Sequence, residues 1–165
     1  MINSARIIEK TLQNYRFKML LPYLIGDVLD FGGNEGELSK FVKGNYTLIN
    51  YDHSSMENKN FDTIVALAVI EHINISDVYK IFKQFKEKLR VDGKIFLTTP
   101  TRISKPVLEF MALIGILDKE NIAEHKHYWN KKEIYDLADK TGFIIEKYER
   151  FQIGFNQFAV LKHKR

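Results

Sequence analysis

The amino-acid sequence predicts an α/β fold, a doubly wound and mostly parallel sheet with an antiparallel C-terminal strand pair. Short, almost wholly apolar segments alternate with amphipathic ones over most of the 165 residues. Continuously apolar strands are typical of a sheet covered on both faces, and their alternation with helices is typical of parallel βαβ units. Two β-like segments follow one another at the C-terminus, so the chain closes with a strand pair. At this length we expect a single domain, residues 1–165.

The N-terminal half is expected to supply one long helix, three strands and one short helix. Apolar residues recur at helical spacing over 4–21, where Ser4 is a start signal and Pro22 a stop signal. The strands are expected at 27–32, 46–52 and 61–70, and the short helix at 35–44.

The C-terminal half begins with the clearest amphipathic helix, 76–90, whose apolar stripe runs from Val78 to Leu89. The remaining expected elements are a strand at 94–100, a helix at about 105–117, a helix at 130–142 that Asn130 starts and Gly142 ends, and closing strands at 143–152 and 157–164. We expect the last two strands to be antiparallel and joined around Gly154.

The composition excludes several kinds of chemistry. The chain has no cysteine, which removes disulfides, thiolate nucleophiles and cysteine-based zinc sites. The net charge is +4, but much of the excess lies in the last five residues, LKHKR, so nucleic-acid binding is not expected. The first ten residues lack the apolar core of a signal peptide, and the most apolar run, 107–117, is shorter than the roughly 20 residues that span a bilayer. We therefore expect a cytoplasmic protein without a membrane span.

Glycine occupies positions 32, 33 and 36, between the first expected strand and the short helix. Such a turn lets the backbone approach a ligand at the carboxyl end of a strand, where open α/β sheets bind their ligands. A P-loop would need Gly-Lys-Ser/Thr, whereas Gly36 is followed by Glu37, and a dinucleotide fingerprint would need a different glycine spacing. Asp30, just before the turn, suits a ligand with a positively charged group.

The stretch VLDFGGNEGELSKFV, residues 28–42, resembles the first motif of the class I S-adenosylmethionine-dependent methyltransferases, Asp/Glu-x-Gly-x-Gly-x-Gly. Asp30, Gly32 and Gly36 match this motif. Asn34 replaces the middle glycine, and asparagine tolerates left-handed backbone geometry better than most residues. The chain is identified as a small member of this family over roughly residues 15–162.

Further stretches resemble family segments in order and spacing: Asp52, which follows Gly32 where the family has an acid that bonds the ribose hydroxyls, FDTIVALAVIEHI at 61–73, LRVDGKIFLTTP at 89–100, and KKEIYDLADKTGFIIEKYE at 131–149. The resemblance implies a Rossmann-like fold and S-adenosylmethionine as the cofactor. It implies methyl transfer to a small-molecule or sugar-like acceptor. The family pattern Asn-Pro-Pro-Tyr is absent, which argues against methylation of exocyclic base nitrogens.

Only residues 53–60 separate Asp52 from Phe61, where the family has a helix and another strand. We therefore expect the sheet to be shortened by about one helix and one strand after strand 2. The adenine pocket would then be more open, with His53 or Ser54 as partial substitutes for the missing contacts.

The resemblance implies cofactor contacts from the first helix, the glycine turn, the end of the second strand and the end of the third. These expected cofactor-binding residues are Tyr15, Asp30, Phe31, Gly32, Gly33, Asn34, Gly36, Asp52, His53, Leu67, Ala68 and Val69. Tyr15 has a plainer alternative, since it could equally be a packing residue of the helix.

Methyl transfer is a direct displacement that needs a base only when the acceptor must lose a proton. His72, after the third strand, and His125, before the last helix, are the candidate catalytic bases, and either could instead be structural. Asp118, Glu124 and His127 lie near His125 in sequence, but the spacing is too unspecific for a metal site. We expect no bound metal ion.

Residues 101–118 are longer than a bare connection requires and could cover the acceptor pocket, pack on the sheet, or form a homodimer or protein-partner contact. Two alternative functions remain open. One is a non-catalytic, methyltransferase-like subunit that binds a partner. The other is an RNA- or tRNA-modifying methyltransferase, which would need a concentrated basic face beside the cleft.

Overall fold

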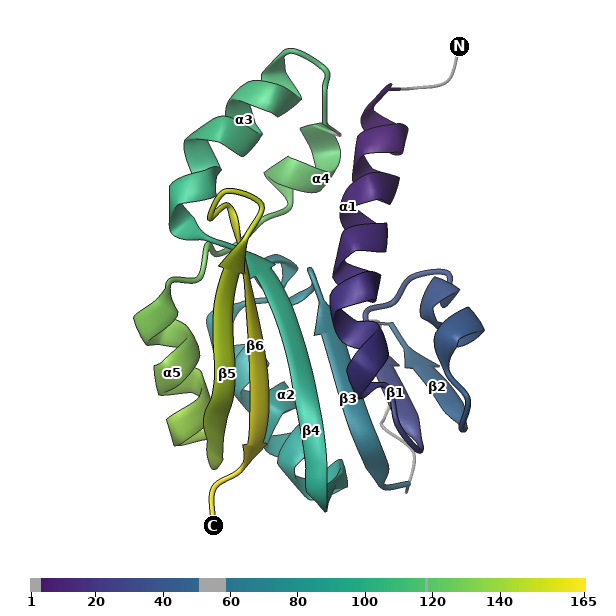
Figure 1. Ribbon diagram of the computed structural model, residues 1–165. Coiled ribbons are helices and arrows are strands. Elements are labelled where there is room, and N and C mark those ends of the chain that lie inside the picture. Colours follow the sequence, from purple (N-terminus) through teal and green to yellow (C-terminus); the bar gives the residue numbers. More distant parts are fainter. Residues whose placement is uncertain (1–3, 51–58, 118) are drawn as a thin grey trace.

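The computed structural model describes residues 4–50, 59–117 and 119–165, and its centre is a six-stranded sheet in the order β2-β1-β3-β4-β6-β5 (Figure 1). The strands are β1 Val28–Phe31, β2 Tyr46–Ile49, β3 Phe61–Leu67, β4 Leu89–Pro100, β5 Phe143–Phe151 and β6 Asn156–His163. The first four strands are parallel to one another, and β6 is antiparallel to both β4 and β5. The predicted fold class is confirmed.

The shortening after the second strand is visible in the sheet order. β3 pairs directly with β1, on the side away from β2. Within the described residues, β2 is an edge strand with no further strand outside it. Over the residues that the structure describes, the sheet therefore ends one strand earlier than the family resemblance alone would give.

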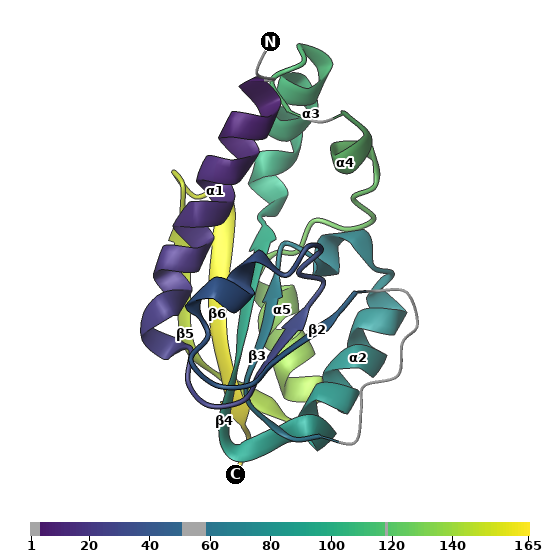
Figure 2. The ribbon, with the colours of Figure 1, turned by 90° about the vertical axis from the view of Figure 1, so that its right-hand side faces the viewer.

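Helices cover both faces of the sheet, with α1 on one face and α2 and α5 on the other (Figure 2). The helices are α1 Ser4–Leu20, α2 Ile75–Lys88, α3 Lys105–Leu113, α4 Lys119–Ala123 and α5 Lys131–Lys140, and the 3-10 turns are η1 Leu21–Tyr23, η2 Glu37–Phe41, η3 Ile70–His72 and η4 Arg102–Ser104. Neighbouring residues of a strand point to opposite faces. In β3, Ile64 and Ala66 pack on the α2 side, whereas Val65 packs on the α1 side.

Two predicted helices are shorter than expected. The helix predicted at 35–44 is only the 3-10 turn η2, which starts after the left-handed Gly36 and buries a single residue, Leu38. With so little apolar surface to bury, the segment has no packing to extend it. The helix predicted at 105–117 ends at Leu113, because Gly115 adopts a φ of 74°. The short α4, which was not predicted, follows it.

The start of the last helix, α5, depends on local residues, whereas the start of β4 depends on pairing with a strand distant in sequence. α5 begins as predicted, because the Asn130 side chain accepts from the Glu133 backbone and the Glu133 carboxylate accepts from the Asn130 backbone in a capping box. β4, in contrast, begins at Leu89 instead of residue 94, because Leu89 already pairs with Phe61 of β3.

The carboxyl ends of the parallel strands lie at one end of the sheet, below α3 and α4 and beside the N-terminal half of α1 (Figures 1 and 2). This is the end at which open α/β sheets bind their ligands. The glycine turn and both candidate bases belong to segments that leave β1, β3 and α4 here.

Candidate functional site

The turn after β1 alternates left-handed residues, with φ of 78° at Gly32, 49° at Asn34 and 70° at Gly36. Asn34 therefore adopts the left-handed geometry that the sequence led us to expect of it. The Gly36 amide donates to the Gly33 carbonyl at 2.9 Å, and the Asn50 side chain donates to the Asn34 carbonyl at 3.1 Å. These bonds hold the turn in a compact form next to the end of β2.

Gly32 lies directly against the end of β3. A Cβ at Gly32 would collide with the Val69 side chain. Ala68 is also left-handed, with φ of 52°, and its amide donates to the Thr98 carbonyl at 2.9 Å. This kink turns the chain after Leu67, so the structure brings the predicted residues Leu67–Val69 to the predicted glycine turn.

Asp30 is buried beneath the turn. The Tyr46 hydroxyl donates to Oδ2 of Asp30 at 2.7 Å, and the carboxyl lies where a Cβ of Gly33 would be. Burial raises the pKa of Asp30 to about 6. The Asp30 carboxyl thus packs against the turn at Gly33 and is held there by the Tyr46 hydroxyl. It is also a buried acid close to the expected cofactor site.

We expect Asp30→Asn to flatten the pH dependence of the unfolding free energy between pH 4 and pH 6. The folded-state pKa of about 6 exceeds the ordinary 3.8, so the folded wild type holds a proton that the unfolded chain releases in this window. The wild type therefore loses stability as the pH rises, by about 3 kcal/mol in all. Asparagine does not titrate, so urea unfolding at pH 4, 5, 6 and 7 would show a smaller loss. Asp92→Asn, at an exposed position, is the control that keeps the wild-type dependence, and equal slopes for Asp30→Asn and wild type would contradict the prediction.

The other predicted cofactor residues differ in where they lie. Phe31 is buried at the end of β1, in the cluster on the α2 side. Tyr15 of α1 stacks on Phe151 of β5, with ring centroids 5.6 Å apart, at the edge of the sheet remote from β1. A contact between Tyr15 and a ligand at the glycine turn therefore stays a prediction. Asp52 and His53 lie outside the described residues.

The structure brings the two candidate bases together, although 52 residues lie between them in sequence. The rings of His72 and His125 meet edge to face, with centroids 4.7 Å apart, and Nδ1 of His125 lies 3.0 Å from the Tyr128 hydroxyl. Burial lowers the pKa of His72, and burial together with the charge of His72 lowers the pKa of His125 to about 4. Both imidazoles are therefore neutral near pH 7 and able to accept a proton.

Glu71 completes this cluster, a role that the sequence did not reveal. Its backbone carbonyl accepts from the amides of Lys126 and His127 at 2.7 and 3.2 Å, which fixes the segment carrying His125 against η3. Its buried carboxyl accepts from the Thr99 hydroxyl at 3.0 Å, and burial raises the pKa of Glu71 to about 7. The sequence spacing could not predict the contact between Glu71 and the segment 126–127, because the two segments are distant in sequence.

Among the described residues, ligand atoms of Glu71, His72 and His125 all lie within 4.8 Å of one another. This composition suits either a metal ion or a relay of protons. The hydrogen bonds from Thr99 and with Tyr128 engage one oxygen of the Glu71 carboxyl and one nitrogen of the His125 ring, so the second oxygen and the second nitrogen remain for either role. Of the acids and histidine weighed from sequence, His127 pairs instead with Glu133 of α5 at 3.2 Å, and Asp118 lies outside the described residues.

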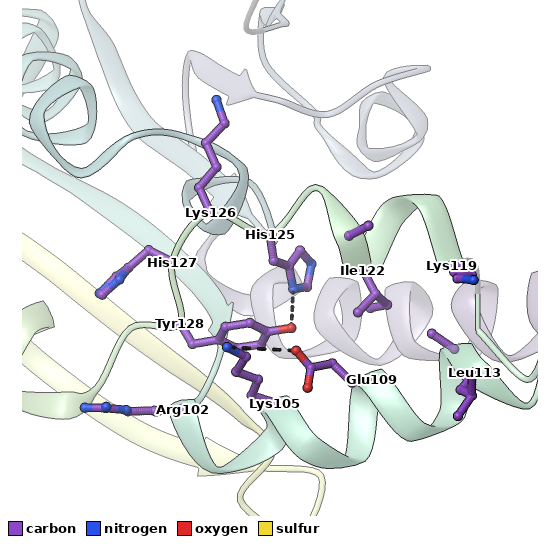
Figure 3. Close-up of a pocket in the computed structure, with 12 residues that line it drawn as sticks. Arg102, Lys105, Glu109, Leu113, Lys119, Ile122, His125, Lys126, His127 and Tyr128 are labelled. Atoms are coloured by element: carbon purple, nitrogen blue, oxygen red, sulfur yellow. Dashed lines mark hydrogen bonds and ion pairs between the residues drawn. The ribbon is translucent and has the colours of Figure 1, made fainter.

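A pocket of about 570 Å³ lies beside the histidines, between α3, α4 and the segment 125–128 (Figure 3). Its lining residues are Arg102, Lys105, Glu109, Ala112, Leu113, Lys119, Ile122, Ala123, His125, Lys126, His127 and Tyr128. α3 thus forms one wall of this pocket, and the expectation that 101–118 covers the pocket of the acceptor stays a prediction. Phe110 and Ile114 of the same segment are exposed, with 60% and 52% of their surface accessible to solvent.

Taken together, the shortened doubly wound sheet, the left-handed glycine turn at β1 and the acid beneath it define a class I methyltransferase fold. The chain belongs to the family described as a methyltransferase domain, whose match covers residues 8–148. No helix among the described residues is long and apolar enough to cross a membrane.

Comparison with known proteins agrees with this assignment. A ubiquinone biosynthesis O-methyltransferase of Rickettsia canadensis (strain McKiel) is 27% identical over 119 residues, which is 65% of this chain and 48% of that protein. The chain thus spans about half the length of this curated relative. A SAM-dependent methyltransferase from Archaeoglobus fulgidus superposes with a TM-score of 0.66 at 14% identity, over 92% of this chain and 93% of the other. CalO1, a methyltransferase in calicheamicin biosynthesis solved with S-adenosylhomocysteine, gives 0.67 at 12% identity over 94% of this chain and 55% of the other.

Proposed function

We propose that the protein transfers a methyl group from S-adenosylmethionine to a hydroxyl oxygen of a small-molecule acceptor. The observation that carries this proposal is the convergence of two features at one end of the sheet. One is the left-handed turn packed against Val69, and the other is the pair of neutral histidines beside a pocket. The O-methyltransferase named among the relatives supports oxygen as the methylated atom.

The residues at the carboxyl ends of β1 and β3 fit the cofactor. The compact turn at Gly32–Gly36 exposes backbone with few side chains, and the chain at Leu67–Val69 lies beside it. Asp52, by family resemblance, would bond the ribose hydroxyls. When bound, S-adenosylmethionine supplies a methyl group on a positively charged sulfur, which is a good leaving group.

The histidines supply what a hydroxyl acceptor needs. As the new oxygen–methyl bond forms and the methyl–sulfur bond breaks, the hydroxyl proton must leave. The neutral imidazole of His125 lines the pocket and can accept this proton. His72 lies against it, at 4.7 Å between ring centroids, and can act as a second acceptor or orient the first.

Calorimetric titration with S-adenosylmethionine and S-adenosylhomocysteine tests the cofactor half of this proposal. We expect micromolar binding by the wild type and at least a tenfold weaker binding by Asp52→Ala, since the ribose would lose a charge-assisted hydrogen bond worth about 1.5–3 kcal/mol. Asp139→Ala, at an exposed acid on α5, is the matched control and should bind as the wild type does. Absence of wild-type binding at millimolar cofactor would overturn the proposal.

A second candidate function is that of a non-catalytic subunit that binds a partner protein. The exposed apolar side chains Phe110, Leu113 and Ile114, at and just beyond the end of α3, are the observation that favours it. The same titration separates the two candidates, because only the enzyme requires cofactor binding.

A further inference from the structure

The described lining of the pocket beside the histidines has more cationic than anionic side chains. Its lining includes Arg102 from η4, Lys105 from α3, Lys119 from α4 and Lys126 from the loop that follows. Glu109 is the one carboxylate of the described lining, and its side chain lies beside Lys105, at 3.9 Å (Figure 3). His125 is neutral near pH 7, and four cationic side chains stand against one carboxylate in the described lining.

The same pocket has an apolar side. Ala112 and Leu113 of α3 lie on it together with Ile122 and Ala123 of α4. The Tyr128 ring forms part of the wall, and the ammonium of Lys105 lies 5.8 Å from its centroid. A ligand with a flat or apolar body and an anionic substituent would match both kinds of surface.

This charge is not needed by the cofactor. None of the described residues of the glycine turn, and neither Ala68 nor Val69, lines the cationic pocket. S-adenosylmethionine carries one carboxylate against a positive sulfur and a positive amino group, so its net charge is positive and it has no use for four cationic side chains. The cationic side chains therefore point to the other substrate.

The bases lie at the wall of this pocket. His125 lines it, contacts the Tyr128 hydroxyl at 3.0 Å, and meets His72 at the end of η3, just beyond β3. A ligand held in the pocket would therefore present its hydroxyl between the cations and the end of the sheet where the methyl donor is expected.

Resting on the proposed methyl transfer, we propose that the acceptor is a hydroxylated, planar or apolar molecule that bears a carboxylate or phosphate group. Arg102 and Lys105 hold the anionic group, and the hydroxyl to be methylated faces His125. A guanidinium suits this task because its N–H groups match two oxygens of a carboxylate or phosphate at once. The apolar side chains of α3 and α4 hold the body of the molecule.

Calorimetry with three related probes tests this assignment, on the protein both alone and saturated with S-adenosylhomocysteine. The probes are 3,4-dihydroxybenzoate, which carries a carboxylate, 2-hydroxyphenyl phosphate, which carries a phosphate, and catechol, which is neutral. We expect at least one anionic probe to bind about tenfold or more tightly than catechol. The preferred probe identifies the source of the negative charge, and added salt should reduce its advantage.

The variant Arg102→Gln/Lys105→Gln provides the site-specific arm. It should lose about tenfold in affinity for the preferred anion while its affinities for catechol and S-adenosylhomocysteine stay unchanged. Arg150→Gln/Lys132→Gln is the matched control, because it removes the same two charges from exposed positions outside the pocket lining. Equal binding of catechol and the anions, no binding of either anion, or undiminished anion binding by the pocket variant would overturn the proposal. Loss of cofactor binding in the wild type would instead count against the proposed function, so the two failures are distinguishable.

Discussion

Gly32→Ala is expected to weaken S-adenosylmethionine binding by about a hundredfold or more. Gly32 has a φ of 78°, and a Cβ there would collide with the Val69 side chain. Either the turn after β1 or the chain after β3 must move, and both are expected to contact the cofactor. Since a hundredfold change corresponds to about 2.7 kcal/mol, a shift that removes two backbone contacts is sufficient. Calorimetric titration of the purified variant measures the effect.

Gly115→Ala is a close control for this variant. Gly115 has a similar φ of 74°, but no atom lies within 4 Å of the position of its Cβ. This substitution therefore has only the cost of a left-handed alanine, about 1–2 kcal/mol of stability, without a steric clash. It should leave cofactor affinity at the wild-type level. If both alanine variants bound the cofactor equally well, the glycine turn would not be the cofactor site.

A second substitution tests whether the collision with Val69 causes the loss of affinity. Val69→Ala added to Gly32→Ala removes both γ carbons of Val69, one of which makes the closest contact with the new Cβ, and leaves the Val69 Cβ at 2.9 Å. Part of the lost affinity should return in the double variant, since the turn can then keep its position. A purely conformational effect at Gly32 would show no such recovery.

His125→Ala is expected to lower kcat by about a hundredfold or more, with a smaller change in KM. General-base catalysis accelerates a reaction by about 10²- to 10⁴-fold. His125 lines the pocket, and its imidazole is neutral near pH 7 and can accept a proton. The measurement is steady-state methyl transfer to the acceptor that the binding experiment selects. His72→Ala should have an effect of the same kind, because its ring packs on that of His125.

The pH profile separates a base from a merely structural histidine. Burial lowers the pKa of His125 to about 4, so the imidazole remains unprotonated, and active as a base, well below pH 6.5. The wild-type rate should therefore fall only as the pH decreases towards 4, whereas a free imidazole would lose activity near pH 6.5. His163→Gln is the control, because His163 of β6 lies outside the pocket lining, with Nε2 3.1 Å from the Leu89 carbonyl, and the activity of this variant should be close to wild type. A His125→Ala enzyme with wild-type kcat would contradict the role of this residue.

Much of the fold could be predicted because its signals are local. The apolar segments of β1 and β3 lie in the sheet, and Asn130 caps α5 as its position before Glu133 indicates. The strand pair at the C-terminus is antiparallel, and β2 is the edge strand of the sheet in the described part of the chain, as the brief connection to Phe61 implied. These features depend on hydrophobic periodicity, capping and chain length, all of which can be read from neighbouring residues.

The sequence pattern predicted the ends of helices and strands less well where tertiary packing decides their length. The segment 35–44 has helical spacing, yet only Glu37–Phe41 forms a turn of 3-10 helix, because a single side chain of it is buried. β4 begins at Leu89 because β3 offers it a partner there. Both boundaries depend on contacts with residues distant in sequence.

The sequence by itself determined the sheet, the left-handed turn and the family, because glycine, asparagine and apolar residues at these spacings constrain the backbone locally. Only the tertiary structure decided how the chemistry-bearing side chains meet. The amides of Lys126 and His127 bind the carbonyl of Glu71, and this places His125 against His72. The packing of α4 and the segment 125–128 beside α3 brings Lys119 and His125 to the pocket that Lys105 also lines. Such groupings arise from long-range packing and hydrogen bonding, for which no single stretch of sequence carries a signal.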